Sequence, residues 1–352
     1  NGGIGLNASI NTAGGTLTLN TTGTSTQTTA FTTNMLTLNG MGGTHLLSSS
    51  NVFSTLTGST GSITLVNSAT TTSFGATTTA GNLQYTGVGN LSLAGTVTVG
   101  GSLILTTPGL VTQTAAFSAG ALDLNGSGTN YTLNIATNSF GSLTGTTGSI
   151  SLANSATTSS IGPVTTSGLL SLTSTGDMTL AGALSVATTL SFDTPGTVSQ
   201  GAAFSANALA LNGSGGTYTL ANAGNSFASL TATTGTINLA NSGTTSVGAT
   251  STTGALSLIS AGTLTVAAGG VNFGGVSQLR STGGNVAVNA AVNRTAASTA
   301  SLALTSDAGA VTISQATGSV GSTASNAFDV TVNAGSTGIS LGGAVNTRGG
   351  AL

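Results

Sequence analysis

The sequence predicts an all-β protein, a parallel β-helix (β-solenoid) with three short strands in each coil of about 20 residues. Three observations carry this prediction. A long segment returns at a fixed distance along the 352 residues, apolar residues occur in pairs separated by one residue, and glycine stands between the pairs. A fixed period marks a repeat protein, the two-residue spacing is typical of strands, and glycine permits the backbone angles of sharp turns.

The long repeat has a period of 87 residues. The segment TGTTGSISLANSATT (144–158) returns with small changes at 57–71 and 231–245. A second segment, VTQTAAFSAGALDLNGSG (111–128), has counterparts at 25–42 and 198–215. The sequence therefore predicts one continuous solenoid over residues 1–352, with long repeats at 25–110, 111–197 and 198–284 and divergent coils at 1–24 and 285–352.

A shorter period lies inside each copy. The first apolar residues of successive strands are spaced by 20, 20, 19 and 28 residues, at Ile63, Leu83, Leu103, Leu122 and Ile150. We interpret each interval as one coil, the longest being a coil with about eight extra residues around Tyr131–Leu133 and, in the next copy, around Tyr218–Leu220. Roughly 17 coils at about 4.8 Å predict a rod on the order of 80 Å.

Three strands fit into one such interval. Residues 82–105 contain four apolar pairs, at Leu83/Tyr85, Leu91/Leu93, Val97/Val99 and Leu103/Leu105. The fourth pair begins the next coil, and glycine separates each pair from the next. A helix is a poor alternative, because apolar residues recur at i, i+2 and Gly, Ser, Thr and Asn dominate.

The repeated asparagines Asn67, Asn154 and Asn241 follow a strand at a predicted corner. Copies about four coils apart would place them roughly 19 Å from one another along the axis. They are therefore too far apart to form one ladder, and we expect each to bond the backbone of its own turn or of the adjacent coils.

Charged residues make up only 2% of the chain, as five Asp and three Arg. Nucleic-acid binding requires a basic surface, so we expect no nucleic-acid partner. Stacked coils disfavour charge, because like charges facing each other on neighbouring strands repel. No apolar run reaches about 18 residues, which predicts no membrane span, and the absence of Cys excludes disulfides and thiolate metal sites.

The first ten residues, NGGIGLNASI, lack the basic and apolar regions of a signal peptide. We expect that a signal was removed or that the chain is an internal part of a longer protein. Neither end of the sequence contains an obvious cap for the exposed strand edges of a solenoid. End-to-end association with further copies, giving a fibre, is therefore an expected partnership.

The segments GTLTLN, GALSLISAGTLTV, SLALTSDAGAVTI and GSTGISLGGAVNTRGG resemble the repeats of filamentous-haemagglutinin-like exoproteins, and the texture is shared by autotransporter passengers. The resemblance covers nearly the whole chain. It implies a right-handed parallel β-helix outside a Gram-negative cell, exported by two-partner secretion or as an autotransporter passenger. It also implies a non-catalytic adhesive or structural role in surface attachment or in a filament or biofilm matrix, with host or surface glycans or proteins bound through other parts.

We predict no catalytic, cofactor-binding or metal-binding residue and therefore no enzyme. Polysaccharide-processing enzymes with this fold need clustered carboxylates, whereas the five acids are scattered and are expected to be exposed turn residues: Asp123, Asp177, Asp193, Asp307 and Asp329. Asp177 and Asp193 could lie on adjacent coils, but at different corners. The single His45, in GGTHLL, has no Cys, Glu or second His to share a metal and is expected to be a surface turn residue.

The arginines and the phenylalanines could each bind a ligand, but a structural role is expected in both cases. Arg280, Arg294 and Arg348 are expected to be solvated, and the alternative is a weak patch for an acidic glycan. The repeated phenylalanines are expected in the interior, and the alternative is an exposed platform for sugars. They are Phe31, Phe53, Phe117, Phe140, Phe204 and Phe227.

Threonine-rich strands suggest a flat ice-binding array. The copies do not keep it, because Thr64 is replaced by Ser151 and Asn238 and Thr37 by Asp123 and Ala210. Asn-x-Ser/Thr sequences are expected by chance in this composition. They occur at Asn7, Asn20, Asn90, Asn125, Asn130, Asn212 and Asn293.

Overall fold

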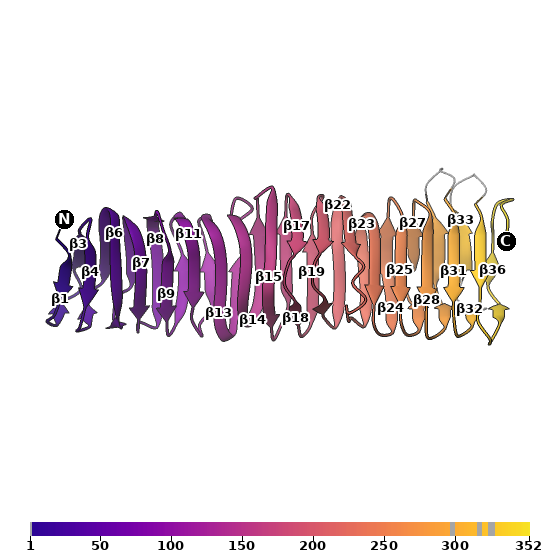
Figure 1. The fold of residues 1–352 in the computed structure, drawn as a ribbon, viewed down its shortest axis with the longest axis horizontal. Helices are drawn as coiled ribbons and strands as arrows, with labels where there is room; N and C mark the ends of the chain where they lie inside the picture. The colour runs from indigo at the N-terminus through magenta and orange to yellow at the C-terminus, as the bar shows by residue number, and fades with distance from the viewer. Residues whose placement is uncertain (1, 296–299, 315–318, 323–327) are drawn as a thin grey trace. The chain divides into compact units, whose positions relative to one another are not determined.

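The chain consists of parallel β-strands stacked coil on coil. The computed structural model describes residues 2–295, 300–314, 319–322 and 328–352, and these residues form strands and turns without a helix. They give a parallel β-solenoid of about 15 turns. The chain divides into two compact units, Asn1–Thr173 and Ser174–Leu352, and within each unit the strands succeed one another in chain order (Figure 1).

The strands of the first unit are β1 (Ile4–Leu6), β2 (Ile10–Asn11), β3 (Thr16–Asn20), β4 (Thr24–Gln27), β5 (Phe31–Thr32), β6 (Met35–Asn51), β7 (Thr55–Asn67), β8 (Thr71–Thr79), β9 (Leu83–Gly87), β10 (Asn90–Leu93), β11 (Val97–Thr106), β12 (Val111–Gln113), β13 (Phe117–Leu133), β14 (Ser139–Asn154), β15 (Thr158–Thr166) and β16 (Leu170–Ser174).

The strands of the second unit are β17 (Asp177–Leu180), β18 (Leu184–Val186), β19 (Thr189–Asp193), β20 (Thr197–Gln200), β21 (Phe204–Ser205), β22 (Ala208–Leu220), β23 (Ser229–Asn241), β24 (Thr245–Thr252), β25 (Leu256–Ser260), β26 (Leu264–Val266), β27 (Val271–Phe273), β28 (Ser277–Ser281), β29 (Val286–Val288), β30 (Ala291–Arg294), β31 (Leu302–Ser306), β32 (Val311–Ile313), β33 (Ser319–Ser322), β34 (Val330–Asn333), β35 (Ile339–Leu341) and β36 (Ala344–Val345).

Apolar columns form the core of the first unit, as the two-residue spacing predicts. Ile63 pairs in register with Leu83, Leu83 with Leu103, and Leu103 with Leu122. All four side chains are at most 1% exposed. Each strand therefore buries the same face as its neighbours above and below, and the predicted intervals of 20, 20 and 19 residues are each one coil.

The interpretation of the 28-residue interval is wrong. Leu122 pairs with Leu143, not with Ile150. Tyr131 pairs with Val111 before it and with Ile150 after it, so Tyr131–Leu133 is an ordinary stacked strand segment and not an insertion. The 87-residue block is therefore four coils plus one further strand. The spacing of apolar residues could not show this, because the column of Leu122 and the column of Ile150 are both apolar.

Equivalent residues of successive copies consequently lie on different sides of the solenoid in the first unit. The column of Ile63 continues through Leu103 to Leu122, whereas the column of Ile150 runs back through Tyr131 to Val111. Val111 belongs to β12, which follows β11 in the same coil. One repeat therefore shifts an equivalent strand to the next side.

A glycine bulge marks the corner where the long strand β13 changes direction. Its pairing with β14 shifts register between Gly126 and Asn130, and Gly126 has a φ of 142°. A Cβ on Gly126 would collide with the carbonyl oxygen of Thr107 in the preceding coil. The same register shift occurs in the other copies, beginning at Gly40 and Gly213.

The second unit shows three strands per coil most clearly in its later part. Strands β28, β29 and β30 stack on β31, β32 and β33, and these stack on β34, β35 and β36. These coils are longer than 20 residues, since β28, β31 and β34 begin at Ser277, Leu302 and Val330. The longer coils help to explain why there are about 15 turns and not roughly 17. The three internal segments without a description fall in the divergent region 285–352.

Candidate functional site

The polar residues that recur in every copy meet at one buried corner. In copy two, Gln113 and Asn138 exchange two hydrogen bonds of 2.8 Å through their side-chain amides. The Asn138 Oδ1 also accepts from the backbone N–H of Phe117 at 3.1 Å, and its Nδ2 donates to the carbonyl of Leu133 at 2.9 Å. One buried side chain thus joins strands of adjacent coils.

Asn154 plays a related role one coil further. Its Oδ1 accepts from the backbone N–H of Phe140 at 3.0 Å, and its Nδ2 donates to the Phe140 carbonyl at 3.1 Å. The same Oδ1 accepts from the N–H of Ala156 at 3.2 Å, a local bond that holds the turn. The side chain therefore pairs with Phe140 as a neighbouring strand would, which confirms that Asn154 bonds its own turn and the adjacent coil.

We call these five residues, Gln113, Phe117, Asn138, Phe140 and Asn154, the amide corner of copy two. The rings of Phe117 and Phe140 stack at a centroid distance of 6.4 Å. The equivalent residues in copies one and three make the same backbone bonds between each second asparagine and the phenylalanine of the preceding coil. These residues are Gln27, Phe31, Asn51, Phe53 and Asn67, and Gln200, Phe204, Asn225, Phe227 and Asn241.

The amide corner satisfies backbone groups that a turn would otherwise leave buried and unpaired. Its phenylalanines are interior, because all six repeated rings are between 0% and 4% exposed. The prediction of core phenylalanines is confirmed, and the sugar platform does not form. The corner contains no titratable group, and its hydrogen bonds join one coil to the next.

Four of the five acids accept hydrogen bonds from an adjacent coil. Asp177 accepts from the N–H of Thr197 at 2.7 Å, and Asp329 accepts from the N–H of Ala351 at 2.9 Å. Asp123 was expected at an exposed turn, and this is wrong: it lies within β13, half-buried, and accepts from the Thr144 hydroxyl at 3.0 Å. An outward position in a strand can hold a carboxylate when the next coil supplies a hydroxyl.

The acids do not converge on one site. Asp177 begins β17 and Asp193 ends β19, so they lie on different strands of one coil and not on adjacent coils. Asp193 and Asp307 are exposed. In the described part of the chain, no three His or Asp residues gather as they would to hold a metal ion.

The arginines do not share a surface. Arg280 forms an exposed ion pair with Asp307, with Nη2 and Oδ2 2.6 Å apart, and the hydrogen bond lowers the pKa of the Asp307 carboxyl. The expectation that Arg294 is solvated is wrong, because it is 0% exposed and its guanidinium lies 5.4 Å from the centre of the Phe328 ring. Arg294 follows Phe273 in the inward column, and the ring face favours the buried cation. Arg348 is exposed, in a turn with a φ of 53°.

His45 also contradicts the expectation. It is 0% exposed, inside β6, and it pairs with Ser25 on one side and Ile63 on the other. Burial lowers the pKa of its imidazole. The sequence contained a signal that could have placed it, because His45 is two residues before the buried Leu47 and so falls in the inward phase of the strand.

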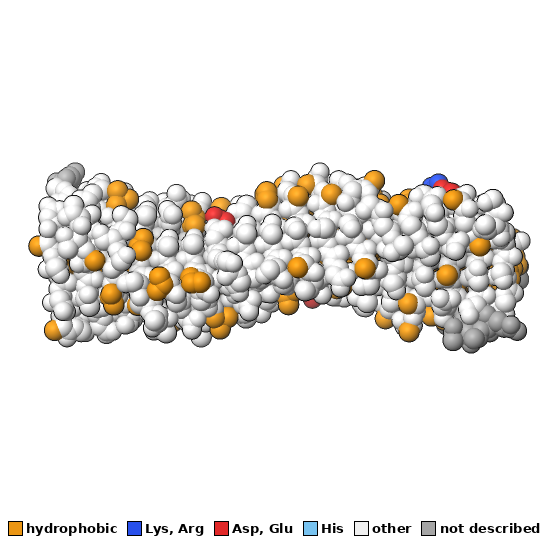
Figure 2. Space-filling view, turned by 90° about the horizontal axis from the view of Figure 1, so that it is seen from below, with side chains coloured by type: hydrophobic (Ala, Val, Ile, Leu, Met, Phe, Trp, Pro, Cys, Tyr) orange, Lys and Arg blue, Asp and Glu red, His pale blue; other side chains and the backbone are white. Residues whose placement is uncertain are grey.

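The outer surface is mainly uncharged. Figure 2 shows hydrophobic side chains dispersed among polar ones and few charged groups on the face in view. Thr37 and Thr57 approach within 3.1 Å through their hydroxyls, but the outward column of Thr64 continues with Gln84 and Ile104. Threonine therefore does not occupy successive positions of that column as a flat ice-binding array requires.

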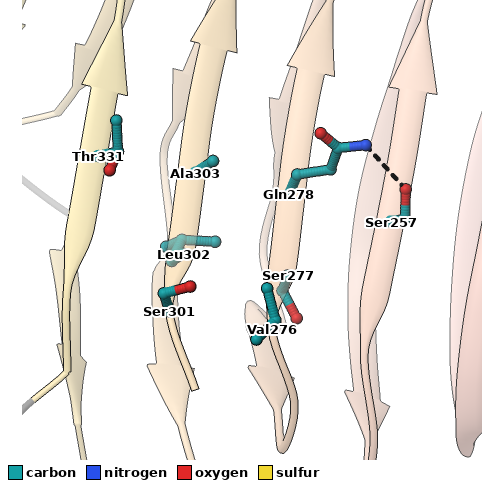
Figure 3. Close-up of a pocket in the computed structure, with 8 residues that line it drawn as sticks. All are labelled: Ser257, Val276, Ser277, Gln278, Ser301, Leu302, Ala303 and Thr331. Atoms are coloured by element: carbon teal, nitrogen blue, oxygen red, sulfur yellow. Dashed lines mark hydrogen bonds between the residues drawn. The ribbon is translucent and has the colours of Figure 1, made fainter. Parts of the chain in front are cut away.

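A hollow of about 320 Å³ lies on the outward face of the second unit. Gln278 projects over it and donates to the Ser257 hydroxyl at 3.0 Å (Figure 3). Val276, 65% exposed, contributes an apolar edge, and no titratable side chain lines the hollow. Its lining residues are Ser257, Val276, Ser277, Gln278, Ser301, Leu302, Ala303 and Thr331.

Parallel pairing from coil to coil and the 87-residue block together define a β-solenoid repeat protein. A family model described as repeats of unknown function (DUF5649) matches residues 80–147, 147–198 and 182–234. Comparisons with curated proteins and with solved structures give no match. Within the described residues, no helix has the length and apolarity needed to cross a membrane.

Proposed function

We propose that the chain is a non-catalytic structural or adhesive segment of a bacterial surface or secreted fibre, of the filamentous-haemagglutinin-like kind and located outside a Gram-negative cell. It would serve surface attachment or the formation of a filament or biofilm matrix. One observation carries the proposal: the recurrent residues of the amide corner are buried or half-buried, and they bond coil to coil.

The contrast between inward and outward positions supports this view. Phe140 and Asn154 of the amide corner have identical counterparts in both other copies. The outward Ser151, between the buried Ile150 and Leu152, corresponds to threonine in copy one and asparagine in copy three. A repeated ligand site would keep its outward side chains, whereas a stack needs only its interior. The recurrent feature is therefore the scaffold.

The stacking also suits a chain exposed to proteases. Extended strands are paired on both sides by neighbouring coils, so a protease must first open the stack to bind a strand. A mostly uncharged outer surface avoids rows of like charge on adjacent strands. Both properties favour a long-lived structural element over a site-bearing domain.

The repeat suggests a direct test, because deletion of residues 111–197 joins Leu110 to Val198, the counterpart of Val111. The junction keeps a native sequence pattern while removing one block. In the producing cells we expect the shortened protein to be exported and folded but to support less attachment or matrix, and a duplication of 111–197 to retain full activity. Surface labelling of intact cells provides the localisation control.

Two results would contradict the proposal. One is unchanged attachment and matrix in cells that lack the whole chain. The other is release of soluble products from a polysaccharide by the purified protein, which would indicate an enzyme.

Glycan binding is the second candidate function, and the hollow in Figure 3 is the observation that favours it. Hydroxyl and amide groups beside an apolar edge suit a neutral sugar better than a charged ligand. Glycan-array binding that is lost in Gln278→Ala and retained in Gln84→Ala, a change on an outward strand position of the first unit, would support this candidate.

A further inference from the structure

The interior of copy one contains a polar pair that the other copies lack. Ser25 in β4 pairs in register with His45 in β6, and both side chains are 0% exposed. The equivalent pair in copy two is Val111 with Tyr131, and in copy three it is Val198 with Tyr218. Copy one therefore places a hydroxyl and an imidazole where the other copies place a valine and a tyrosine.

At this position the tyrosine hydroxyls form hydrogen bonds. The Tyr131 hydroxyl lies 2.7 Å from the carbonyl oxygen of Asn125 and 2.9 Å from that of Leu105, to which it donates. His45 differs: neither ring nitrogen has a hydrogen-bond partner, and the Ser25 hydroxyl has none either. The backbone of Asn39, the counterpart of Asn125, is close enough to favour a protonated ring slightly, without hydrogen-bond geometry.

The surroundings of His45 offer no charge to stabilise a cation. The inward column above and below the pair contains Ile4 and Ile63. The strands packed against β6, namely β3, β4, β5 and β7, contain no Asp, Arg or other titratable residue. The first acid of the chain is Asp123. An imidazolium at this site would be buried without a counter-ion, which is costly.

We propose that the Ser25–His45 pair makes the coils around it acid-sensitive, so that protonation of the imidazole drives local opening of residues 24–67 while the equivalent coils of the other copies stay closed. This acid sensitivity follows from two features, the buried His45 nitrogens and Ser25 hydroxyl that lack hydrogen-bond partners and the apolar column around them. It is independent of the adhesive role proposed above.

The sign follows from proton linkage. Burial lowers the pKa of His45 in the closed coils, whereas the opened chain has the ordinary value of 6.5. Above about pH 6.5 both forms are neutral and the opening equilibrium is independent of pH. Below that value the open form binds the proton, so the opening constant rises by up to about tenfold per pH unit until the closed form also titrates.

Hydrogen exchange of the full chain, followed by mass spectrometry from pH 4.5 to 8 and corrected for intrinsic exchange, tests the proposal. We expect peptides from β4, β6 and β7 to lose protection below about pH 6.5 by up to about tenfold per unit. Peptides from the equivalent strands of copy two serve as an internal control and should not respond. Equal pH dependence in both copies would overturn the proposal.

Variants separate the imidazole from other acid effects. The double change Ser25→Val and His45→Tyr converts the pair to that of copy two and should remove the response, as should His45→Leu. Persistence of the response in either variant would refute the role of His45. If neither folds, the single imidazole C2–H signal of the native chain decides: titration below the ordinary value is expected, and titration near 6.5 would overturn the proposal.

Discussion

Asn154 offers the sharpest test of how the amide corner holds the coils together. Its side chain is 4% exposed and bonds three backbone groups, the N–H and carbonyl of Phe140 and the N–H of Ala156. Asn154→Ala removes all three bonds and adds no steric conflict. Both Phe140 groups then lack a partner inside the solenoid, because the amide occupied the position of a neighbouring strand.

The expected cost can be worked from these contacts. Loss of the bond to Ala156 costs about 1 kcal/mol, and stranding the buried N–H and carbonyl of Phe140 costs about 1 to 3 kcal/mol each, so Asn154→Ala should destabilise this corner by about 3 to 7 kcal/mol. The effect should be local, because each coil contacts only its neighbours. Amides near Phe140 should therefore exchange with solvent about two to five orders of magnitude faster.

The matched control is Asn134→Ala, the same substitution at an exposed position. Its Oδ1 accepts one bond, from the Ser151 hydroxyl at 3.0 Å. Hydrogen exchange of both variants, compared peptide by peptide, measures the difference. If Asn154→Ala accelerates exchange around Phe140 no more than Asn134→Ala does, the amide does not substitute for strand pairing and the reasoning fails.

Three further predictions concern other parts of the scaffold. Burial raises the pKa of the Tyr131 phenol, so the unfolded chain ionises first and the free energy of unfolding falls above about pH 10. Tyr131→Phe should lower the free energy of unfolding by about 1 to 2 kcal/mol at pH 7, because the hydroxyl bonds are lost. In denaturant unfolding at a series of pH values, the same variant should lose less stability above about pH 10 than the native chain does. Gly213 has a φ of 114°, so Gly213→Ala should destabilise the second unit by more than about 2 kcal/mol in thermal unfolding, whereas Gly243→Ala, with open space around it, should change little. Arg280→Ala should leave the unfolding temperature unchanged and let the Asp307 carboxyl titrate at a higher pH in a carbon NMR titration; a clear fall in unfolding temperature would contradict it.

The stacked columns were predictable because they depend on local pattern. Apolar residues two apart mark the inward face, and a steady interval of about 20 residues marks the coil. That information places Ile63, Leu83 and Leu103 in one column without knowledge of the corners. The register of the next coil was not predictable, because it depends on the course of the backbone through the bulge at Gly126.

The polar residues were harder to place, and for one physical reason. Residue type alone suggests that charged and polar residues are exposed. In a strand, however, alternate residues face opposite sides, so the position along the strand decides whether a side chain faces inward or outward. His45 is in phase with Leu47, and Arg294 is in phase with Val292, so both point inward with buried neighbours. The two-residue pattern already contained this information. The ring that accommodates the Arg294 guanidinium belongs to another coil, and spacing could not identify it.

The length of the 87-residue repeat helps to explain why the residues of the amide corner recur between copies. Because 87 residues make four coils and one further strand in the first unit, a side chain repeated on the outside appears there on a new side of the solenoid, as the columns of Ile63 and Ile150 do. Outward repetition of that kind cannot build a straight row for a flat ligand. Inward repetition has no such limit, since Asn67 and Asn154 bond the coil before them and their own turns, whichever side they occupy. A repeat of this length therefore favours the amide corner over any surface array, and the variable outward positions are the expected consequence.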